Sequence, residues 1–362
     1  MRLDHELGPT VLPALQDRAG IYEIDPLQDS RWAEFVGRHP RASVFHTPSW
    51  LSALQWAYGY EPAVFSTSPP NEALRSGLVF CRLKSRLTGN RLVSLPFSDH
   101  CEPLVETKEE LDTILLGLKS TVGRQWKYVE MRPIEQAPEG ASGFAECHSY
   151  YWHYVDLSPG CEALFRGFHK DCVQRKIRRA ERESLSYEVG NSEQLLKKFY
   201  RLLIITRRRY GLPPPPYFWF QQLSRAFGHN MQVRIASHNG APVASIVTLK
   251  QGGTVVYKYG GSDVRFNRLG GMSLLFWQTI LEAKQEGLSR LDLGRADLDN
   301  QGLIQFKEHW GARRVVLKYL KFPDRPDITH HSFSAPLLRT MVRAVPEWCL
   351  IAAGKFLYPH IG

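Results

Sequence analysis

Apolar and polar residues alternate along many segments of the chain, which predicts strands, and apolar residues at three- and four-residue spacing predict helices between them. The pattern is clearest at residues 254–322, where it predicts a strand, a glycine-containing turn, a helix, a strand, a short helix and a final strand. The turn, at residues 264–271, is basic and runs directly into an apolar helix. Because free N–H groups at the start of a helix attract anions, we predict that this turn holds a phosphate or pyrophosphate.

The same pattern predicts the remaining elements. Strands are expected at residues 21–24, 62–66, 77–83, 91–95, 127–131, 151–156, 232–238 and 242–250. Helices are expected at residues 30–38, 49–58, 109–122, 164–182, 193–209 and 217–227. Ser30 and Thr47 are candidate N-caps, and Asn239-Gly240 is typical of a type I′ hairpin turn.

The second half repeats the element order of the first. Residues 61–131 and 232–294 each give three strands, a loop, a helix and a strand, and Arg132 and Arg295 occupy matching positions after the closing strands. Self-similarity of this kind indicates a duplicated domain. The first copy has residues 98–107, without glycine, in place of the glycine-containing turn. We therefore expect only the second copy to hold a phosphate-bearing donor, and the first to bind the acceptor or serve as a scaffold.

The expected fold is α/β, with a mixed sheet in each of two tandem domains. A chain of 362 residues is too long for one ordinary core, and 43% hydrophobic residues suffice for packed cores. The expected domains are residues 20–145 and 146–323, followed by a tail at residues 324–362.

Composition narrows the class of protein further. The net charge of +10 fits a nucleic acid, a phosphate-bearing molecule or an anionic membrane as partner, but a basic enzyme with none of these fits equally well. The six cysteines are scattered without a C-x-x-C pair, so neither a disulfide framework nor a zinc site is predicted. No signal-peptide pattern and no apolar run of about 20 residues occurs, so a cytoplasmic protein is expected.

One short segment, from Asp99 through His100 and Cys101 to Glu102, contains residue types that bind metals. Four consecutive residues cannot all face one ion. We therefore predict that this segment lines a cleft, and we expect no metal.

The turn and its surrounding elements resemble the GNAT-like acyltransferase fold. GNAT enzymes carry a turn of the form Q/R-x-x-G-x-G/A before a helix, and its amides hold the pyrophosphate of coenzyme A. The matching positions, with the residue after them, are Asn267, Arg268, Leu269, Gly270, Gly271, Met272 and Ser273. Asn267 stands where Gln or Arg is usual, and Met272 stands where a small residue is usual. The resemblance implies acyl-CoA, such as acetyl-CoA, as the donor.

Further motifs resemble the branch of Fem-type aminoacyltransferases and polysaccharide-associated acetyltransferases. The stretch GLIQFKEHWGA before the final strand matches that branch at Gly302, Phe306, Lys307 and Gly311, and HTPSW, which begins at His46, is similar to the N-terminal half of the polysaccharide-associated members. The resemblance covers roughly residues 20–322.

Three residues are candidates for catalysis. Lys307 lies just before the last strand, and the resemblance implies that it supplies positive charge to a developing oxyanion. Asp292 lies on the strand face opposite Leu291 and Leu293, where it is a general base, a ligand for the acceptor amine or a solvent-facing carboxylate. Tyr259 lies at a strand end that would line the acyl path. Tyr259 is expected to share its strand face with Tyr257, an aromatic pair that is typical of a core.

Further residues are candidates for binding the substrates. Asp297 and Asp299 lie in a loop at a strand end, where function is common. The other candidates are Phe306, Arg295, His46, Arg175 and Arg179. For His46 the residue pattern favours a capping or core role over ligand binding, and the arginines are equally compatible with a solvated helix face.

Three functions remain open from the sequence. The first is transfer of an acyl group from acyl-CoA to an amine of a cell-envelope or exopolysaccharide precursor. The second is a Fem-type aminoacyltransferase that uses aminoacyl-tRNA on a peptidoglycan-type precursor, which the basic helix at residues 164–182 favours. The third is a GNAT-like protein that only binds a partner.

The C-terminal residues 336–356 are apolar with interspersed cations. An amphipathic helix at a membrane surface would suit a lipid-linked sugar or peptide acceptor and would place the protein at the periphery of the inner membrane. Packing of this segment back onto the domains is the alternative.

Overall fold

A computed structural model describes residues 20–135, 143–324 and 345–361. Within these residues one mixed sheet of 12 strands runs through the molecule in the order β1-β2-β3-β4-β5-β12-β6-β11-β10-β9-β8-β7. Two neighbouring pairs, β4–β5 and β10–β11, are parallel, and the other described pairs are antiparallel. Each parallel pair is joined by one helix, α3 or α8, so the predicted repeat is present.

The first half contains the following strands and helices: β1 Tyr22–Ile24, α1 Ser30–Arg38, α2 Pro48–Tyr58, β2 Glu61–Ser66, β3 Leu78–Leu83, β4 Arg91–Val93, α3 Lys108–Thr121 and β5 Tyr128–Met131. The central strand β6 follows at Ala145–Asp156. Thr47 caps α2 as predicted, by accepting the N–H of Trp50.

The second half has more helices: α4 Cys161–Gly167, α5 Arg175–Arg182, β7 Ser186–Gly190, α6 Glu193–Tyr210, α7 Tyr217–Phe227, β8 Met231–His238, β9 Ala241–Gln251, β10 Thr254–Ser262, α8 Gly271–Gln285, β11 Arg290–Asp297, α9 Gln301–Glu308 and β12 Arg313–Phe322. Asn239 and Gly240 both have positive φ, as a type I′ turn requires.

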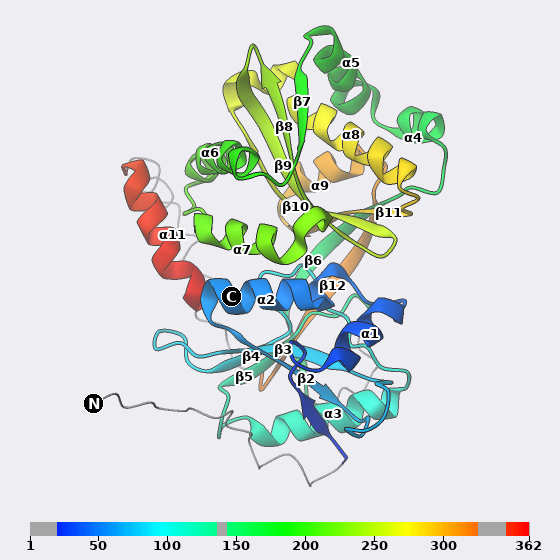
Figure 1. Cartoon of the computed structure of the whole chain (residues 1–362), viewed down its shortest axis with the longest axis vertical. Coiled ribbons are helices and arrows are strands. Elements are labelled where there is room, and N and C mark those ends of the chain that lie inside the picture. The colour runs from blue at the N-terminus through cyan, green and yellow to red at the C-terminus, as the bar shows by residue number, and fades with distance from the viewer. Residues whose placement is uncertain (1–19, 136–142, 325–344, 362) are drawn as a thin grey trace, which may run out of the picture.

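The two halves exchange their central strands. β6 follows β5 in the chain but pairs with β11, and the last residues of β12, Leu320–Phe322, pair with β5. β6 and β12 also pair with each other along most of their length. The sheet is therefore continuous across the join, by which we mean the region where β12 and β6 lie between β5 and β11. The halves are fixed relative to each other (Figure 1).

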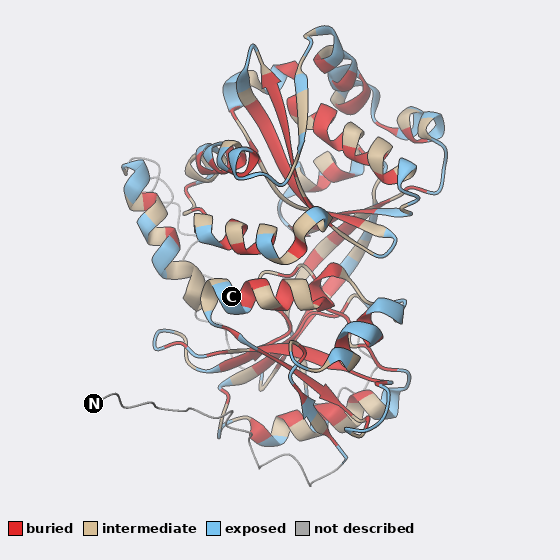
Figure 2. Ribbon diagram, in the orientation of Figure 1, coloured by how far each residue is buried: buried red, intermediate tan, exposed pale blue. Residues whose placement is uncertain are grey.

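One hydrophobic core spans the join. Helices α2 and α7 pack side by side there, and Trp50 and Trp219 meet edge to face with ring centroids 5.4 Å apart. A second core lies on the other face of the second half, under α8 and α5. Figure 2 shows buried residues along the strands at the centre of the molecule and exposed residues on the outer sides of the helices.

The C-terminal helix α11, Glu347–Ile361, packs along both halves (Figure 1). Tyr60 donates a hydrogen bond to the carbonyl of Tyr358, and Gly354 approaches the carbonyl of Pro214 so closely that a Cβ atom would not fit. Residues 336–344 of the predicted tail helix lie outside the described part of the chain. Within the described residues, no helix is long and apolar enough to cross a membrane.

The predicted single helix at residues 164–182 is wrong, because the chain breaks after Gly167. The N–H of His169 donates to the carbonyl of His309, and the His169 imidazole accepts the N–H groups of Asp171 and Cys172. These contacts start a new helical turn, which leads into α5. The break separates the apolar α4 from the basic α5.

Smaller differences have local causes. Asp29 rather than Ser30 caps α1, because its carboxylate accepts the N–H of Arg31. β6 begins at Ala145 instead of residue 151, because β12 supplies a pairing partner that the sequence does not reveal. The short edge strand β7 was not predicted, since Ser186–Gly190 is half polar.

Candidate functional site

The candidate site lies where β10 and β11 separate. The two parallel strands pair for three residues, ending at Val256 and Asp292. Beyond that pair β10 continues along β9 and β11 continues along β6. Each strand has a register shift there, at Tyr257/Tyr259 in β10 and at Asp292/Arg295 in β11. Bulges bend a strand and increase its twist, which accounts for the separation.

The shift in β10 overturns the expected placement of its tyrosines. Tyr257 packs edge-on against Phe276 of α8, whereas Tyr259 accepts a 2.8 Å hydrogen bond from Trp219 Nε1 of α7. Since α7 and α8 belong to cores on opposite faces, the two tyrosines point to opposite sides. Strict alternation failed because the bulge adds Lys258 between them. Burial raises the pKa of both phenols, that of Tyr257 to about 12.

Lys307 enters this region from α9 and is 2% exposed. Its Nζ donates to the carbonyl oxygens of Gly294 (2.7 Å) and Arg295 (2.8 Å), both in the bulge of β11. An ammonium has three N–H groups, so one remains for a ligand. Burial lowers the pKa of Lys307 to about 8, against the raising effect of Asp99 and Asp292. Phe306, the preceding residue, packs against Phe276.

Asp292 lies on the face opposite Leu291 and Leu293, as predicted, but it is 2% exposed rather than solvent-facing. Its Oδ1 accepts hydrogen bonds from Trp152 Nε1 (2.7 Å) and from the N–H of Gly294 (2.6 Å). Its Oδ2 lies 3.1 Å from His100 Nε2. Since His100 belongs to the first half, this contact joins the two halves at the site.

A second ion pair crosses the join beside it. Lys258 from the β10 bulge donates to Asp99 at 2.8 Å. Burial alone would raise the pKa of Asp99, but Lys258 and Arg295 outweigh it and lower that pKa to about 2. Arg295 donates to the hydroxyl of Tyr319 at 2.6 Å, and this hydroxyl donates to the carbonyl of Asp99 at 2.7 Å. Arg295 is thus held within the protein rather than presented to solvent.

A cleft of about 430 Å³ opens at the join, on the side of Asp292. His100, Asp292 and Val256 contribute to its wall, together with the aromatic side chains of Trp152 and Tyr154. Besides Asp292, its charged lining residues are Arg41, Glu102, Glu135 and Arg290. The segment from Asp99 to Glu102 therefore contributes to a cleft wall, as its sequence predicted.

The glycine-containing turn leads into α8 as predicted. Gly270, with φ of +81°, precedes the helix, and α8 has neither a side-chain N-cap nor an acidic residue in its first turn. The N–H groups of Gly271, Met272 and Ser273 have no acceptor among the described residues. Gly270 also contacts the carbonyl of Lys176 in α5, so the turn is covered on one side.

The side chains of the turn differ in exposure. Asn267 and Arg268 are exposed, Leu269 and Ser273 are buried, and Met272 is half-buried against the core under α8. The turn therefore offers free amides beside an exposed cation. This arrangement suits an anion.

The remaining predicted site residues lie apart from Lys307 and Asp292. Asp297 and Asp299 are exposed where β11 leads into α9. Arg175 and Arg179 form exposed ion pairs along the outer face of α5, with Asp171 and Glu183. These four side chains are thus on the surface, whereas Lys307 and Asp292 are buried.

His46 is fully buried and serves the fold. Its Nδ1 accepts the N–H of Ser43 at 3.0 Å, and its Nε2 lies 2.9 Å from the carbonyl of Glu102. Burial lowers the pKa of His46 to about 4. These contacts fix the start of α2 against the loop that carries His100.

The sequence indicated Lys307 and Asp292, but it missed His100, Lys258 and Tyr319 as parts of one site. His100 was noted only as part of a cleft-lining segment. No spacing rule links it to Asp292, because the two residues are 192 positions apart.

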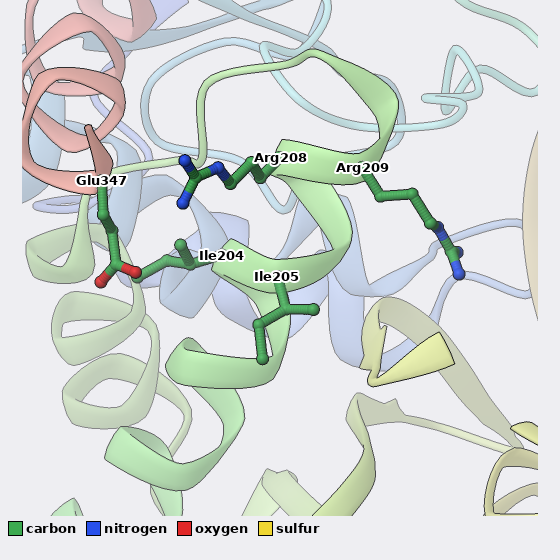
Figure 3. Close-up of a pocket in the computed structure, with 5 residues that line it drawn as sticks. All are labelled: Ile204, Ile205, Arg208, Arg209 and Glu347. Carbon is green, nitrogen blue, oxygen red and sulfur yellow. The ribbon is translucent and has the colours of Figure 1, made fainter. Parts of the chain in front are cut away.

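Two other features lie away from the site. A hollow between α6 and α11 is lined by Ile204, Ile205, Arg208, Arg209 and Glu347. In Figure 3, Arg208 extends toward α11 and Arg209 points away from it. His169, Cys172 and His309 offer ligand atoms within 4.8 Å of one another. However, His169 Nδ1 accepts two backbone N–H groups, which leaves the proton of a neutral ring on Nε2, so this ring would have to reorganise to bind an ion.

Comparisons with known proteins agree with this architecture. A family model described as an acetyltransferase (GNAT) domain matches residues 169–308. No curated protein sequence matches the chain. The crystal structure of FemX is similar over 82% of this chain and 96% of its own, with a TM-score of 0.66 at 14% identity.

Two further solved structures share the fold. A tandem GNAT protein from the clavulanic acid biosynthesis pathway is similar over 85% of this chain and 99% of its own, with a TM-score of 0.51 at 11% identity. The C-terminal domain of a putative lysylphosphatidylglycerol synthetase from Agrobacterium fabrum is similar over 82% of this chain and 91% of its own, with a TM-score of 0.52 at 13% identity. The chain thus has a tandem GNAT-like fold, and the matched GNAT domain lies in its second half.

Proposed function

We propose that the protein transfers an acyl group from acyl-CoA to an amine of a sugar-containing precursor of the cell envelope or an exopolysaccharide. One observation carries this proposal. The buried ammonium of Lys307, with one N–H left for a ligand, lies at the bulge where β10 and β11 separate. The acceptor cleft includes the last paired residues of the same two strands, Val256 and Asp292.

The donor would be held at the start of α8. The amides of Gly271, Met272 and Ser273, the positive end of the helix dipole and the exposed Arg268 together suit a pyrophosphate. Acyl-CoA supplies the activated carbonyl carbon and a thiolate leaving group.

Lys307 would stabilise the negative charge that develops on the carbonyl oxygen. Its position is fixed by two backbone carbonyls, so little reorganisation is needed during the reaction. Because the site is buried, a fixed positive charge acts there more strongly than it would in water. No nucleophile of the protein is needed, and the acceptor amine attacks the thioester directly.

The cleft supports a polar acceptor with an apolar face. Trp152 and Tyr154 present aromatic rings 4.9 Å apart, and Glu102 and Arg290 provide hydrogen-bonding charges beside them. Rings with polar groups at their edges suit a pyranose, which has an apolar face and peripheral hydroxyls. An amino sugar is therefore the acceptor that this lining favours.

The test is release of free thiol from acetyl-CoA, followed with a thiol-reactive dye, against a panel of glucosamine, galactosamine, a glycyl peptide and putrescine. We expect turnover with the amino sugars and formation of the N-acetyl product by mass spectrometry. Absence of turnover with all four amines would contradict the proposed function.

A second candidate donor is aminoacyl-tRNA. The exposed cations on α5 favour it, because this helix contacts the glycine turn and phosphate contacts dominate nucleic-acid affinity. Salt-sensitive binding of tRNA, without binding of acetyl-CoA in calorimetry, would support this candidate over the first.

A further inference from the structure

We propose that His100, held by Asp292, is the general base that removes a proton from the acceptor amine. This inference rests on the proposed acyl transfer and names the group that activates its nucleophile. The base comes from the first half of the chain, and the Lys307 ammonium comes from the second.

The carboxylate of Asp292 fixes the imidazole. Its Oδ1 is occupied by Trp152 Nε1 and the N–H of Gly294, and its Oδ2 accepts from His100 Nε2 at 3.1 Å. With its proton on Nε2, a neutral imidazole has its lone pair on Nδ1. A carboxylate that orients one ring nitrogen so that the other accepts a proton is a well-attested arrangement for general bases.

His100 Nδ1 is buried and has no hydrogen-bond partner among the described residues. A buried nitrogen without a partner is unfavourable, and a bound proton donor would relieve that cost. Phe45 and Trp152 hold the ring edge to face, each with centroids 5.2 Å away. His100 and Asp292 both line the cleft, so an acceptor amine bound there would lie beside the imidazole.

Charged and titratable groups face His100 from several elements packed around it. Asp292 faces it from β11, Asp99 lies beside it in its own loop, and His46 lies near it in the segment before α2. Lys258 from β10 is paired with Asp99. The Asp292 carboxylate lies 3.1 Å from Nε2, opposite the nitrogen that would take the proton.

The proton balance is simple. The acceptor arrives as an ammonium and gives one proton to His100 Nδ1, which yields the neutral amine. The amine nitrogen bonds to the thioester carbon, and the carbon–sulfur bond breaks. The second proton leaves the nitrogen for the thiolate, and His100 returns its proton to water. The products are an amide, free thiol and one proton.

The alternative is that His100 and Asp292 only fasten the two halves together. A His100→Gln protein separates the two roles, because its amide can still donate to Asp292 but cannot serve as a base. His238→Gln, at the end of β8 and away from the cleft, is the matched control.

We would measure thiol release from acetyl-CoA with glucosamine between pH 5.5 and 9. In the unmodified protein kcat/KM should rise with pH at the acidic end. In His100→Gln it should fall about 100-fold and lose this rise, as expected for loss of a general base. The acetyl-CoA dissociation constant and the circular dichroism spectrum should stay unchanged. Added imidazole should restore part of the rate in His100→Ala.

A His100→Gln protein with the normal rate and pH profile would overturn this inference while leaving the acyl transfer intact. An unmodified protein that transfers to no amine would contradict the transfer reaction itself, and the inference with it. If His100→Gln does not fold, nitrogen NMR of the unmodified protein decides. The His100 Nδ1 signal should shift when glucosamine is added, and an unmoved signal would overturn the proposal.

Discussion

The two halves of the molecule contain the same unit, a parallel strand pair joined by a helix. They differ in how the N-terminus of that helix is capped. In the first half Thr107 accepts the N–H of Glu110, and the Glu110 carboxylate accepts in return the N–H of Thr107. This capping box and the nearby Glu109 satisfy the helix start and repel anions. In the second half Gly270 leaves the start of α8 without a side-chain cap.

The loop before each helix differs accordingly. In the second half it is the short glycine turn that approaches α5. In the first half it is longer and carries Asp99 and His100 across the join to Lys258 and Asp292 of the second half. The two copies of the duplicated unit therefore differ in structure. The second copy leaves the start of its helix uncapped, and the first copy contributes two side chains that contact the second.

The largest expected effect comes from removing the buried ammonium of Lys307 in the second half. Lys307→Met keeps the length of the side chain but removes the charge, so thiol release should fall by about 100- to 1000-fold. Lys197→Met, on the exposed side of α6, is the control and should retain full activity. A Lys307→Met protein that is folded and fully active would remove Lys307 from the mechanism.

Glycine substitutions compare the two halves directly. Gly270 and Gly59 both have positive φ, but a Cβ at Gly270 would lie 2.2 Å from the carbonyl of Lys176, whereas a Cβ at Gly59 meets nothing within 4 Å. Gly59→Ala should therefore cost about 1 kcal/mol of unfolding free energy, from backbone strain alone. Gly270→Ala should cost about 3 kcal/mol, because α5 must also move. Urea unfolding gives both values, and calorimetry should show weaker acetyl-CoA binding only for Gly270→Ala. Equal costs would mean that α5 does not constrain the turn.

Most of the order of elements, the Thr47 cap and the glycine turn before α8 could be predicted, because each depends on neighbouring residues. Thr47 before Pro48 and Asn239 before Gly240 are local signals of this kind. The break after Gly167 could not be predicted, since it depends on the His309 carbonyl, which lies beyond several intervening elements.

The residues of the candidate site likewise differ in whether a local signal indicates them. Lys307 was proposed from its motif, and the face on which Asp292 lies was predicted from strand alternation. The opposite orientations of Tyr257 and Tyr259 were missed, because a bulge is set by how two strands pair and leaves no clear local pattern. The contact between His100 and Asp292 was missed for the same reason, since it exists only after the halves join.

The pH dependence of activity should reveal the buried ammonium. Because burial lowers the pKa of Lys307 to about 8, a growing fraction loses its charge above that pH. Thiol release should therefore fall about tenfold per pH unit well above pH 8. Lys307→Arg should be less active but should lack this alkaline decline, since a guanidinium keeps its charge. An alkaline decline that persists in Lys307→Arg would assign it to another group.

Two buried histidines, one in each half, should respond differently to replacement. Burial lowers the pKa of both His46 and His153 to about 4 in the folded protein. Between about pH 6.5 and 4 the unfolded chain therefore binds protons that the folded protein does not. The free energy of unfolding is highest above about pH 6.5 and falls as the pH falls toward about 4. His46 has partners for both ring nitrogens, whereas neither nitrogen of His153 has a hydrogen-bond partner among the described residues. His46→Leu should lower the free energy of unfolding by about 2 kcal/mol at pH 7, and His153→Leu should raise it by about 1 kcal/mol. Both replacements should make stability fall less steeply between pH 6.5 and 4, as measured by urea unfolding at each pH. A loss of stability in His153→Leu would show that its nitrogens are satisfied in solution.

The smallest effect on stability should come from the exposed cations of α5. Arg175 and Arg179 pair with Asp171 and Glu183 one helical turn away, and exposed pairs of this kind are worth little. Neutralising both arginines to Gln should change the free energy of unfolding by less than about 0.5 kcal/mol. If the donor is acyl-CoA held at α8, the double variant should also keep most of its thiol-release activity. A double variant that stays folded but loses salt-sensitive tRNA binding would instead show that α5 contacts a nucleic acid. The uncapped start of α8 would then bind a phosphate of a donor other than acyl-CoA.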